Sequence, residues 1–187
     1  MVDGKVQVSG ATAVMAINEK LLDTLMQKNP NLSFALQQSF PFKGTYADAV
    51  PLGPLMELGA GGQSPFTQAQ AADSLQYWQN TAQQVLADPV AVDSPTTLKS
   101  YSHDATAAAN LLAAHNFVTE AEQAYGLASQ LWPDNPEPVS GLADLLNSAG
   151  QPDQARQLLQ TFTSQHPDQQ NALQRMSATF RLVMPGQ

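Results

Sequence analysis

The second half of the chain repeats itself at a fixed interval. Comparison of the segment that starts at Ser102 with the segment that starts at Pro136 gives identical residues at a constant offset of 34 positions. The identical pairs are Ala109 and Ala143, Leu111 and Leu145, Leu112 and Leu146, Ala121 and Ala155, Gln123 and Gln157, Pro133 and Pro167, and Asp134 and Asp168. A constant offset of this size is the signature of a repeat architecture, in which each unit buries its apolar face against its neighbours.

The repeated residues have physical reasons to be where they are. Each unit places alanines where its two helices are expected to cross, and a small side chain there lets the backbones approach closely. Asn116 and Gly150 stand at the turns between helices, and both tolerate the left-handed conformation that a helix end often requires. Each unit ends at one of the paired prolines, and Asn135-Pro136 then starts a new helix with a cap and a first-turn proline.

These features together resemble the tetratricopeptide repeat, whose unit is a pair of antiparallel helices. The resemblance covers about residues 102–184, with repeats at 102–135 and 136–169, and residues 1–66 show no family resemblance. Phe162 departs from the pattern, because its counterpart in the first repeat is the small Ala128, and we expect looser or differently angled packing there. The alternative interpretation is a generic helical bundle with coincidental spacing.

A last amphipathic helix is predicted at 170–184, where it would cap the final hairpin. Its apolar positions are Leu173, Met176, Phe180 and Val183, and it stops before Pro185-Gly186. Arg175 and Arg181 would favour its carboxyl end electrostatically.

Helices are also predicted upstream of the repeats. Thr67 followed by Gln70 fits a capping box, and that helix should end near Asp88-Pro89. Ser94 with Pro95 opens another helix, which should run to about Ala114. The fold class is therefore all-α: antiparallel helical hairpins stacked as a short α-solenoid of the tetratricopeptide type, with a domain at 67–187 preceded by a separate segment at 1–66.

The segment 1–66 combines one helix with an irregular stretch. Helical spacing runs from Val14 to Leu25 and stops at Asn29-Pro30. Lys5 to Val8 is either a short strand or an unstructured lead, and we favour the lead. Residues 31–64 are punctuated by proline and glycine but are too apolar for simple disorder. Within them, Leu32 to Ser39 is consistent with a brief helix.

The composition excludes several kinds of partner. The net charge is −8, with 8 basic against 16 acidic residues, so no basic cluster is available for nucleic acid or for an anionic bilayer. No stretch approaches the roughly 18 apolar residues of a membrane helix, and we expect no membrane insertion. The absence of cysteine excludes disulfides and thiolate metal sites, and it slightly favours a periplasmic or other extracytoplasmic location.

No catalytic constellation is visible. The histidines His103, His115 and His166 are too scattered for a metal pair, and Gly59-Ala60-Gly61-Gly62 lacks the lysine of a phosphate loop. Trp78 and Trp132 fit packing positions better than a ligand cage. We therefore predict neither enzyme activity, nor a metal, nor a cofactor.

The resemblance implies a groove lined by the first helix of each repeat. Carried over position by position, the peptide-binding residues are His103, Thr106, Asn110 and Ala113, then Glu137, Ser140, Asp144 and Asn147, with Asn171, Gln174 and Arg181 extending the row. Relatives that clamp the carboxy-terminal carboxylate of chaperone peptides use lysine and arginine in this groove. The segment from Ser102 to Pro167 contains only one lysine or arginine, Arg156, so binding of this kind is disfavoured. The expected partner is a neutral or basic peptide, or a helix. The alternative is that these polar side chains merely solvate one face.

Two functions follow from this groove. The first is a protein-binding or peptide-binding scaffold, expected to be part of a larger protein because the chain opens abruptly at Met1. The second is a structural domain whose groove is covered by its own residues 31–64.

Overall fold

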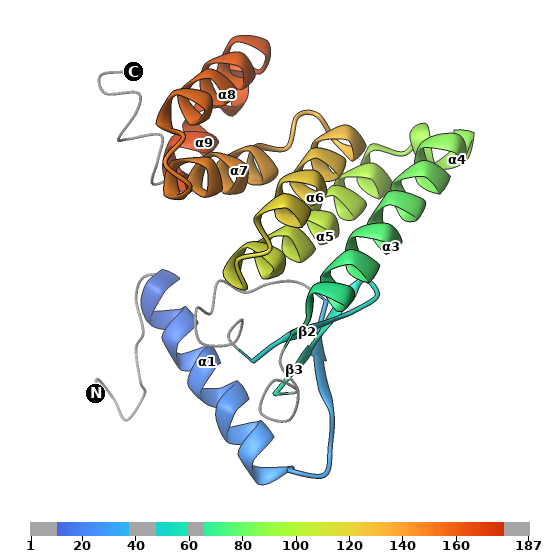
Figure 1. Ribbon diagram of the computed structural model, residues 1–187, viewed down its shortest axis with the longest axis vertical. Helices are drawn as coiled ribbons and strands as arrows, with labels where there is room; N and C mark the ends of the chain where they lie inside the picture. The colour runs from blue at the N-terminus through green and yellow to red at the C-terminus, as the bar shows by residue number, and fades with distance from the viewer. Residues whose placement is uncertain (1–10, 38–47, 60–65, 178–187) are drawn as a thin grey trace, which may run out of the picture.

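The computed structural model describes residues 11–37, 48–59 and 66–177, and it places a stack of helices on a small sheet (Figure 1). The elements are, in order, α1 (Ala11–Lys28), β1 (Phe34–Leu36), β2 (Val50–Leu52), β3 (Leu55–Leu58), α3 (Gln68–Ala87), α4 (Pro89–Val92), α5 (Pro95–Ala114), α6 (Val118–Leu131), α7 (Pro136–Ser148), α8 (Pro152–Gln165), a 3-10 turn (Pro167–Gln169) and α9 (Gln170–Met176). The all-α solenoid prediction is confirmed, with the sheet as an addition.

The sequence signals for the helix ends operate as expected. Thr67 and Gln70 form the reciprocal capping box of α3, and Ser94 caps α5 by accepting from the Thr97 backbone N–H. Asn116 and Gly150 have φ angles of 63° and 77°, in the left-handed region that each helix-to-helix turn requires. Residues 5–8, for which a strand or a lead was predicted, lie outside the described residues.

Helices α5 and α6 form the first hairpin, and α7 and α8 form the second. The four crossing alanines, Ala109, Ala121, Ala143 and Ala155, are each 0% exposed. Phe162 stands where the first repeat has Ala128, yet it is buried in one cluster with Leu159 and Leu173. The second hairpin thus uses a bulky side chain, covered by α9, at a place where the first uses a small one.

Helix α9 is shorter than the predicted helix at 170–184. It ends at Met176, and Ser177 is already in extended backbone conformation. Ser177 is fully buried and continues the spacing of Ala109 and Ala143 by a further 34 positions. Helix α9 therefore takes the place of the first helix of a third unit, and the expected contributions of Phe180, Arg181 and Val183 lie outside the described residues.

Helix α3 packs as if it were the second helix of a preceding unit. It lies alongside α5 and α6 and runs parallel to α6, with the short α4 in the connection to α5 (Figure 1). Trp78 is 1% exposed and shares a cluster with Ala105 and Leu131, which confirms its role as a packing anchor. Trp132, at the end of α6, is half-buried.

The irregular interpretation of 31–64 is wrong for its described part. Phe34–Leu36 is a strand, although a brief helix was predicted from Leu32 to Ser39, and the three antiparallel strands lie in the order β1-β3-β2. Pro51 is compatible with a strand here because β2 is an edge strand, and Gly53 supplies the positive φ of the tight turn into β3.

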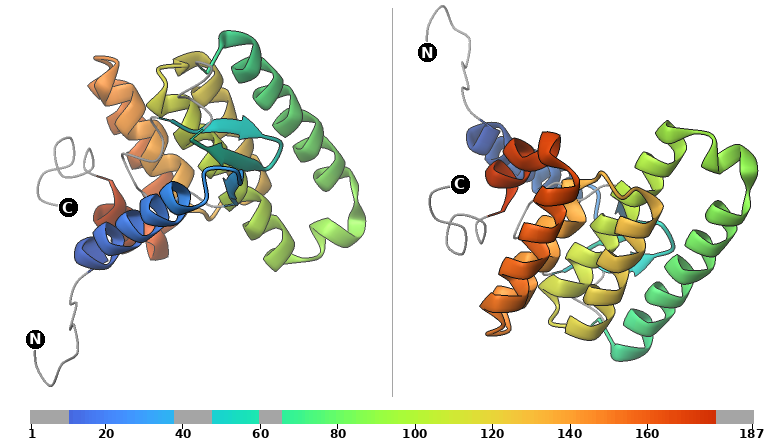
Figure 2. Two further views of the ribbon diagram at one scale, coloured as in Figure 1. Left: turned by 90° about the horizontal axis from the view of Figure 1, so that it is seen from below. Right: turned by 90° about the horizontal axis from the view of Figure 1, so that it is seen from above.

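The sheet covers one flank of α5. Met56 and Leu58 from β3, together with Ala49, share an apolar cluster with Ala107 and Leu111 of α5. Seen from below, the strands lie across the ends of the helices, with α1 further out (Figure 2). Strand β2 also contacts both α3 and α5, so the sheet packs against these two helices.

Candidate functional site

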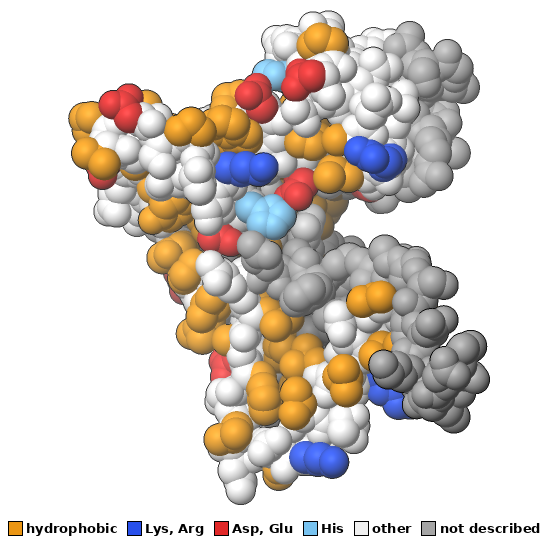
Figure 3. All heavy atoms as spheres, turned by 180° about the vertical axis from the view of Figure 1, so that it is seen from behind, with side chains coloured by type: hydrophobic (Ala, Val, Ile, Leu, Met, Phe, Trp, Pro, Cys, Tyr) orange, Lys and Arg blue, Asp and Glu red, His pale blue; other side chains and the backbone are white. Residues whose placement is uncertain are grey.

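The predicted groove residues come from α5, α7 and α9, the three equivalent first helices. Side chains on neighbouring helices meet along this row. His103 on α5 contacts Glu137 on α7, its counterpart 34 positions later, through a hydrogen-bonded ion pair. Figure 3 shows the molecule from behind, with a histidine between acidic and basic side chains near the middle of the view.

Two predicted residues are buried and present no surface to a ligand. Thr106 is 4% exposed, and its hydroxyl donates to the Ser102 carbonyl oxygen 2.7 Å away within α5. Ser140 of α7 is 7% exposed. These small polar residues let the helices pack closely and are not placed to contact a peptide.

Two further predicted residues hold the repeat together. Asn110 accepts a hydrogen bond from the hydroxyl of the buried Tyr125 at 2.7 Å, which joins α5 to α6. Asp144 accepts one from Ser177 at 3.3 Å, which joins α7 to the end of α9. Substitution of either residue would therefore disturb packing as well as the surface.

The other described residues of the predicted row lie at least partly at the surface. Asn171 is exposed, whereas Ala113, Asn147 and Gln174 are half-buried. Amide side chains can donate and accept hydrogen bonds at once, which suits them to pairing with the main chain of an extended peptide. The accessible polar part of the row is thus smaller than the sequence indicated.

A pocket of about 260 Å³ lies at the amino-terminal end of this row, between α5 and α7. Its lining residues are Thr96, Lys99, Ser100, His103, Asn135 and Glu137. The groove prediction omitted the first three because it started the repeat at Ser102. A signal for them existed, because Ser94-Pro95 marks the start of α5 and because Lys99 and Thr96 precede His103 by four and seven residues on one helix face.

A buried hydrogen-bond network fixes one wall of the pocket. The Asn135 side chain caps α7 by accepting from the Glu137 backbone N–H at 3.0 Å, and its amide donates to the Ser102 hydroxyl at 3.0 Å. Ser102 in turn donates to the Ala128 carbonyl oxygen at 2.7 Å. The start of α7 is thereby tied to both helices of the first hairpin.

Charges in the pocket are largely balanced by one another. The hydrogen bond that His103 donates to the Glu137 carboxylate raises the pKa of His103 above its ordinary value of 6.5, against the opposing effects of burial and of Lys99. Lys99 is exposed and borders the pocket as a second cation. The pocket therefore presents a cation and a neutralised pair, and it does not present a free carboxylate.

Substitution of Glu137 with glutamine is expected to cost less than about 1 kcal/mol, because the ion pair is partly exposed. The raised folded-state pKa means that the stabilisation is fully present below about pH 6.5 and is lost as the pH rises through the folded-state pKa. Urea unfolding between pH 5 and pH 9 should show that the difference in free energy of unfolding between the native and E137Q proteins decreases as the pH rises. The control is Glu122→Gln on α6, and a pH-independent difference for E137Q would contradict the assignment.

A second buried ionisable group lies beside the row. Asp104 is 8% exposed, and burial raises the pKa of its carboxyl, while hydrogen bonding from Gln37, just after β1, acts in the opposite direction. Its Oδ1 atom has no hydrogen-bond partner among the described residues. Asp104 thus ties the amino-terminal segment to α5.

The described residues hold no group of three or more histidine, aspartate or glutamate side chains that could bind a metal ion. Within the same part of the chain, no helix has the length and apolar character needed to cross a membrane.

Comparison with known proteins agrees with the helical geometry. Residues 102–178 match a family model described as "Tetratricopeptide repeat", over the two hairpins and α9. No curated protein and no solved structure gives a significant match to the chain. Residues 102–178 therefore belong to the tetratricopeptide-repeat family.

Proposed function

We propose that the chain is a protein-interaction module that binds a segment of a partner along the row formed by α5, α7 and α9. Tetratricopeptide repeats generally act as non-catalytic scaffolds for protein partners. The observation that carries the proposal is the pocket at the head of this row, beside side-chain amides that remain accessible. Catalysis is not part of the proposal.

The bound segment is a largely uncharged peptide that lies along the row and places one side chain in the pocket. Glu137 is engaged by His103, and Lys99 adds a cation, so a strongly basic side chain is disfavoured at the pocket itself. Further along, Asn147 and Asn171 pair with peptide groups. The sequence alone predicted a neutral or basic peptide. The charges around the pocket favour a neutral side chain in the part of the peptide that enters it.

The test uses peptides selected against the native protein from a random display library. Joint substitution of Lys99, Asn147 and Asn171 with alanine should weaken their binding at least about tenfold, or about 1.4 kcal/mol. Asn110 and Asp144 belong to the predicted row but are left unchanged in this test, because both also support packing.

A matched variant controls for effects away from the row. Gln157 and Gln160 are exposed on α8, and alanine substitutions there should leave peptide affinity unchanged. Equal affinity of the native and row-substituted proteins, measured by fluorescence anisotropy, would exclude the row as the binding surface.

The second candidate is a structural role for residues 31–64 in covering the groove. It is favoured by the packing of Met56 and Leu58 on Ala107 and Leu111, next to the row. In the same peptide assay, Met56→Asp should loosen the sheet and increase peptide affinity if the segment competes for the groove. If a folded Met56→Asp protein binds the peptides with unchanged affinity, the sheet does not compete for the groove and serves only to cap the helices. We propose that residues 67–187 form one repeat domain.

A further inference from the structure

Two exposed apolar patches lie outside the proposed groove, at opposite ends of the molecule. The first is a stripe on α1 formed by Val14, Ile17, Leu21 and Leu25, which are 41–56% exposed. Leu22 and Met26 on another side of α1 pack against the sheet cluster, and none of the elements at 11–37, 48–59 and 66–177 covers the stripe. An amphipathic helix that buries one face and exposes a second apolar face marks an interaction surface.

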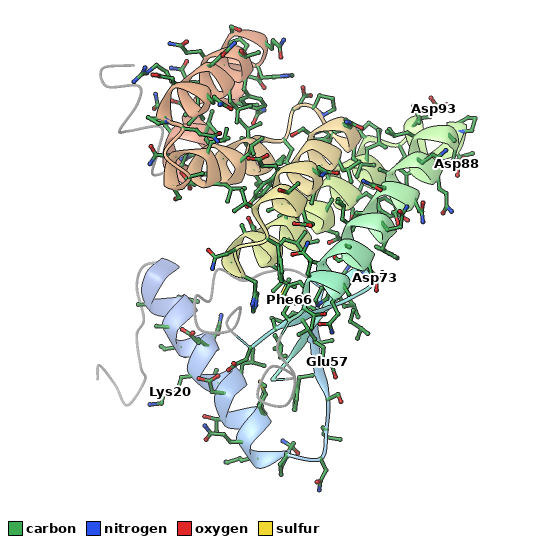
Figure 4. All side chains as sticks on the ribbon, viewed as in Figure 1. Lys20, Glu57, Phe66, Asp73, Asp88 and Asp93 are labelled. Atoms are coloured by element: carbon green, nitrogen blue, oxygen red, sulfur yellow. The ribbon has the colours of Figure 1, made fainter. Side chains whose placement is uncertain are left out.

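The α1 stripe is bordered by positive charge. Lys28 follows Leu25 by three residues and Lys20 follows Ile17 by three, so both lie on or beside the stripe. Asp23 is two residues from Leu21 and from Leu25, a separation that turns it to the opposite side of the helix. In Figure 4, Lys20 points outward from α1.

The second patch lies where α3 ends and α4 begins. Leu86 is 41% and Val90 79% exposed, whereas Val92, 43% exposed, is two residues from Val90 and lies toward the other side of α4. Asp88 and Asp93 bracket α4 and are both exposed, and the stretch from Gln76 to Leu98 contains no lysine or arginine. Figure 4 shows Asp88 and Asp93 at the end of the molecule remote from Lys20.

We propose that the α1 stripe of one copy docks on the α3–α4 patch of a second copy. Both patches are apolar, and their bordering charges have opposite signs. Pairing of two α1 stripes would bring lysines together, and pairing of two α3–α4 patches would bring carboxylates together, so contact between unlike patches is favoured. The two patches lie too far apart to meet within one copy.

A contact between unlike patches has a consequence for assembly. Each copy that docks through α1 still offers its own α3–α4 patch, so association continues into a ring or an open chain of copies. The patches are small, and the affinity should fall roughly between 10 µM and 1 mM. Sedimentation of the full chain should therefore show a weight-average mass that rises above 20.0 kDa with concentration.

Complementary variants test the pairing in the full chain. One variant, Leu21→Ser with Leu25→Ser, removes the α1 stripe, and a second, Val90→Ser with Asp93→Ser, removes the α3–α4 patch. All four positions are exposed, so both proteins should fold, as circular dichroism would check. Each variant alone should stay a monomer. An equimolar mixture should form dimers and nothing larger, because only one pair of intact patches remains.

The control is Met176→Ser, which removes an exposed apolar side chain far along the chain and should leave association unchanged. The proposal is overturned if the native protein stays monomeric up to 1 mM, or if the mixture of variants stays monomeric. It is equally overturned if the variant without the α3–α4 patch still associates, since that result means α1-to-α1 pairing.

Discussion

Replacement of Trp78 with alanine is expected to lower the free energy of unfolding by about 3–5 kcal/mol. The indole is 1% exposed and fills the space between α3, Ala105 of α5 and Leu131 of α6. Removing it leaves a cavity at the place where α3 takes over the role of a preceding repeat. Urea unfolding followed by circular dichroism measures the change.

Two neighbouring substitutions show whether the effect comes from this packing. The ring centroids of Tyr77 and Trp78 lie 5.4 Å apart in an edge-to-face arrangement, but Tyr77 is 36% exposed. Tyr77→Ala should therefore lower the free energy of unfolding clearly less than Trp78→Ala. The Trp78 Nε1 atom has no hydrogen-bond partner in the described part of the chain. Trp78→Phe keeps most of the ring and removes this unpaired donor, so a net change within about 1.5 kcal/mol is expected. Equal losses for Trp78→Ala and Tyr77→Ala would contradict the role assigned to the indole.

The repeat was predictable because its signals are local. Crossing alanines, left-handed turn residues and the prolines that end each hairpin depend on a few adjacent positions, and all recur at the same offset. The third copy of the small residue, Ser177, follows the same rule, and extending the comparison by 34 positions would have found it. Local chemistry repeated in register therefore specifies this half of the fold.

The sheet was harder to predict because its strands are short, and because one proline lies within β2 and another in the turn that follows it. Pro51 and Pro54 suggest broken structure when taken alone, whereas β2 is an edge strand that tolerates Pro51. Its stability depends on contacts of Met56 and Leu58 with Ala107 and Leu111, about 50 residues away in sequence. Pairing over such a separation leaves no local pattern in the sequence.

The alignment of the first helices was predictable, but the accessibility of their side chains was not. The repeat frame correctly brings His103 next to Glu137. The repeat frame does not show that Thr106 is buried or that Asn110 accepts a hydrogen bond from Tyr125, because both depend on how closely neighbouring helices approach. That approach is set at one position in α7, which leads to a second substitution with a large expected effect.

Replacement of Gly141 with alanine is expected to destabilise the protein by about 1–3 kcal/mol, although alanine is the better helix former. A Cβ atom at Gly141 would lie 2.5 Å from Cε1 of Tyr125 and 2.6 Å from Cζ. Tyr125 is 2% exposed, and its hydroxyl is bonded to Asn110, so the ring cannot move away without breaking that bond. Glycine at 141 is thus what lets α7 approach α6.

Gly126 in α6 provides the matched control. A Cβ atom there meets no atom within 4 Å, so Gly126→Ala should stabilise the protein by about 0.5–1 kcal/mol through helix propensity alone. The two glycine substitutions should therefore change the free energy of unfolding, measured in urea, in opposite directions.

Combining Gly141→Ala with Tyr125→Leu, which makes room for the methyl group, should cost less stability than the sum of the single changes. Additive losses would mean that Gly141 acts through something other than Tyr125. Because Asn110 bonds to the same ring, its side-chain amide resonances should shift in the Gly141→Ala protein, which links this helix contact to the geometry of the groove.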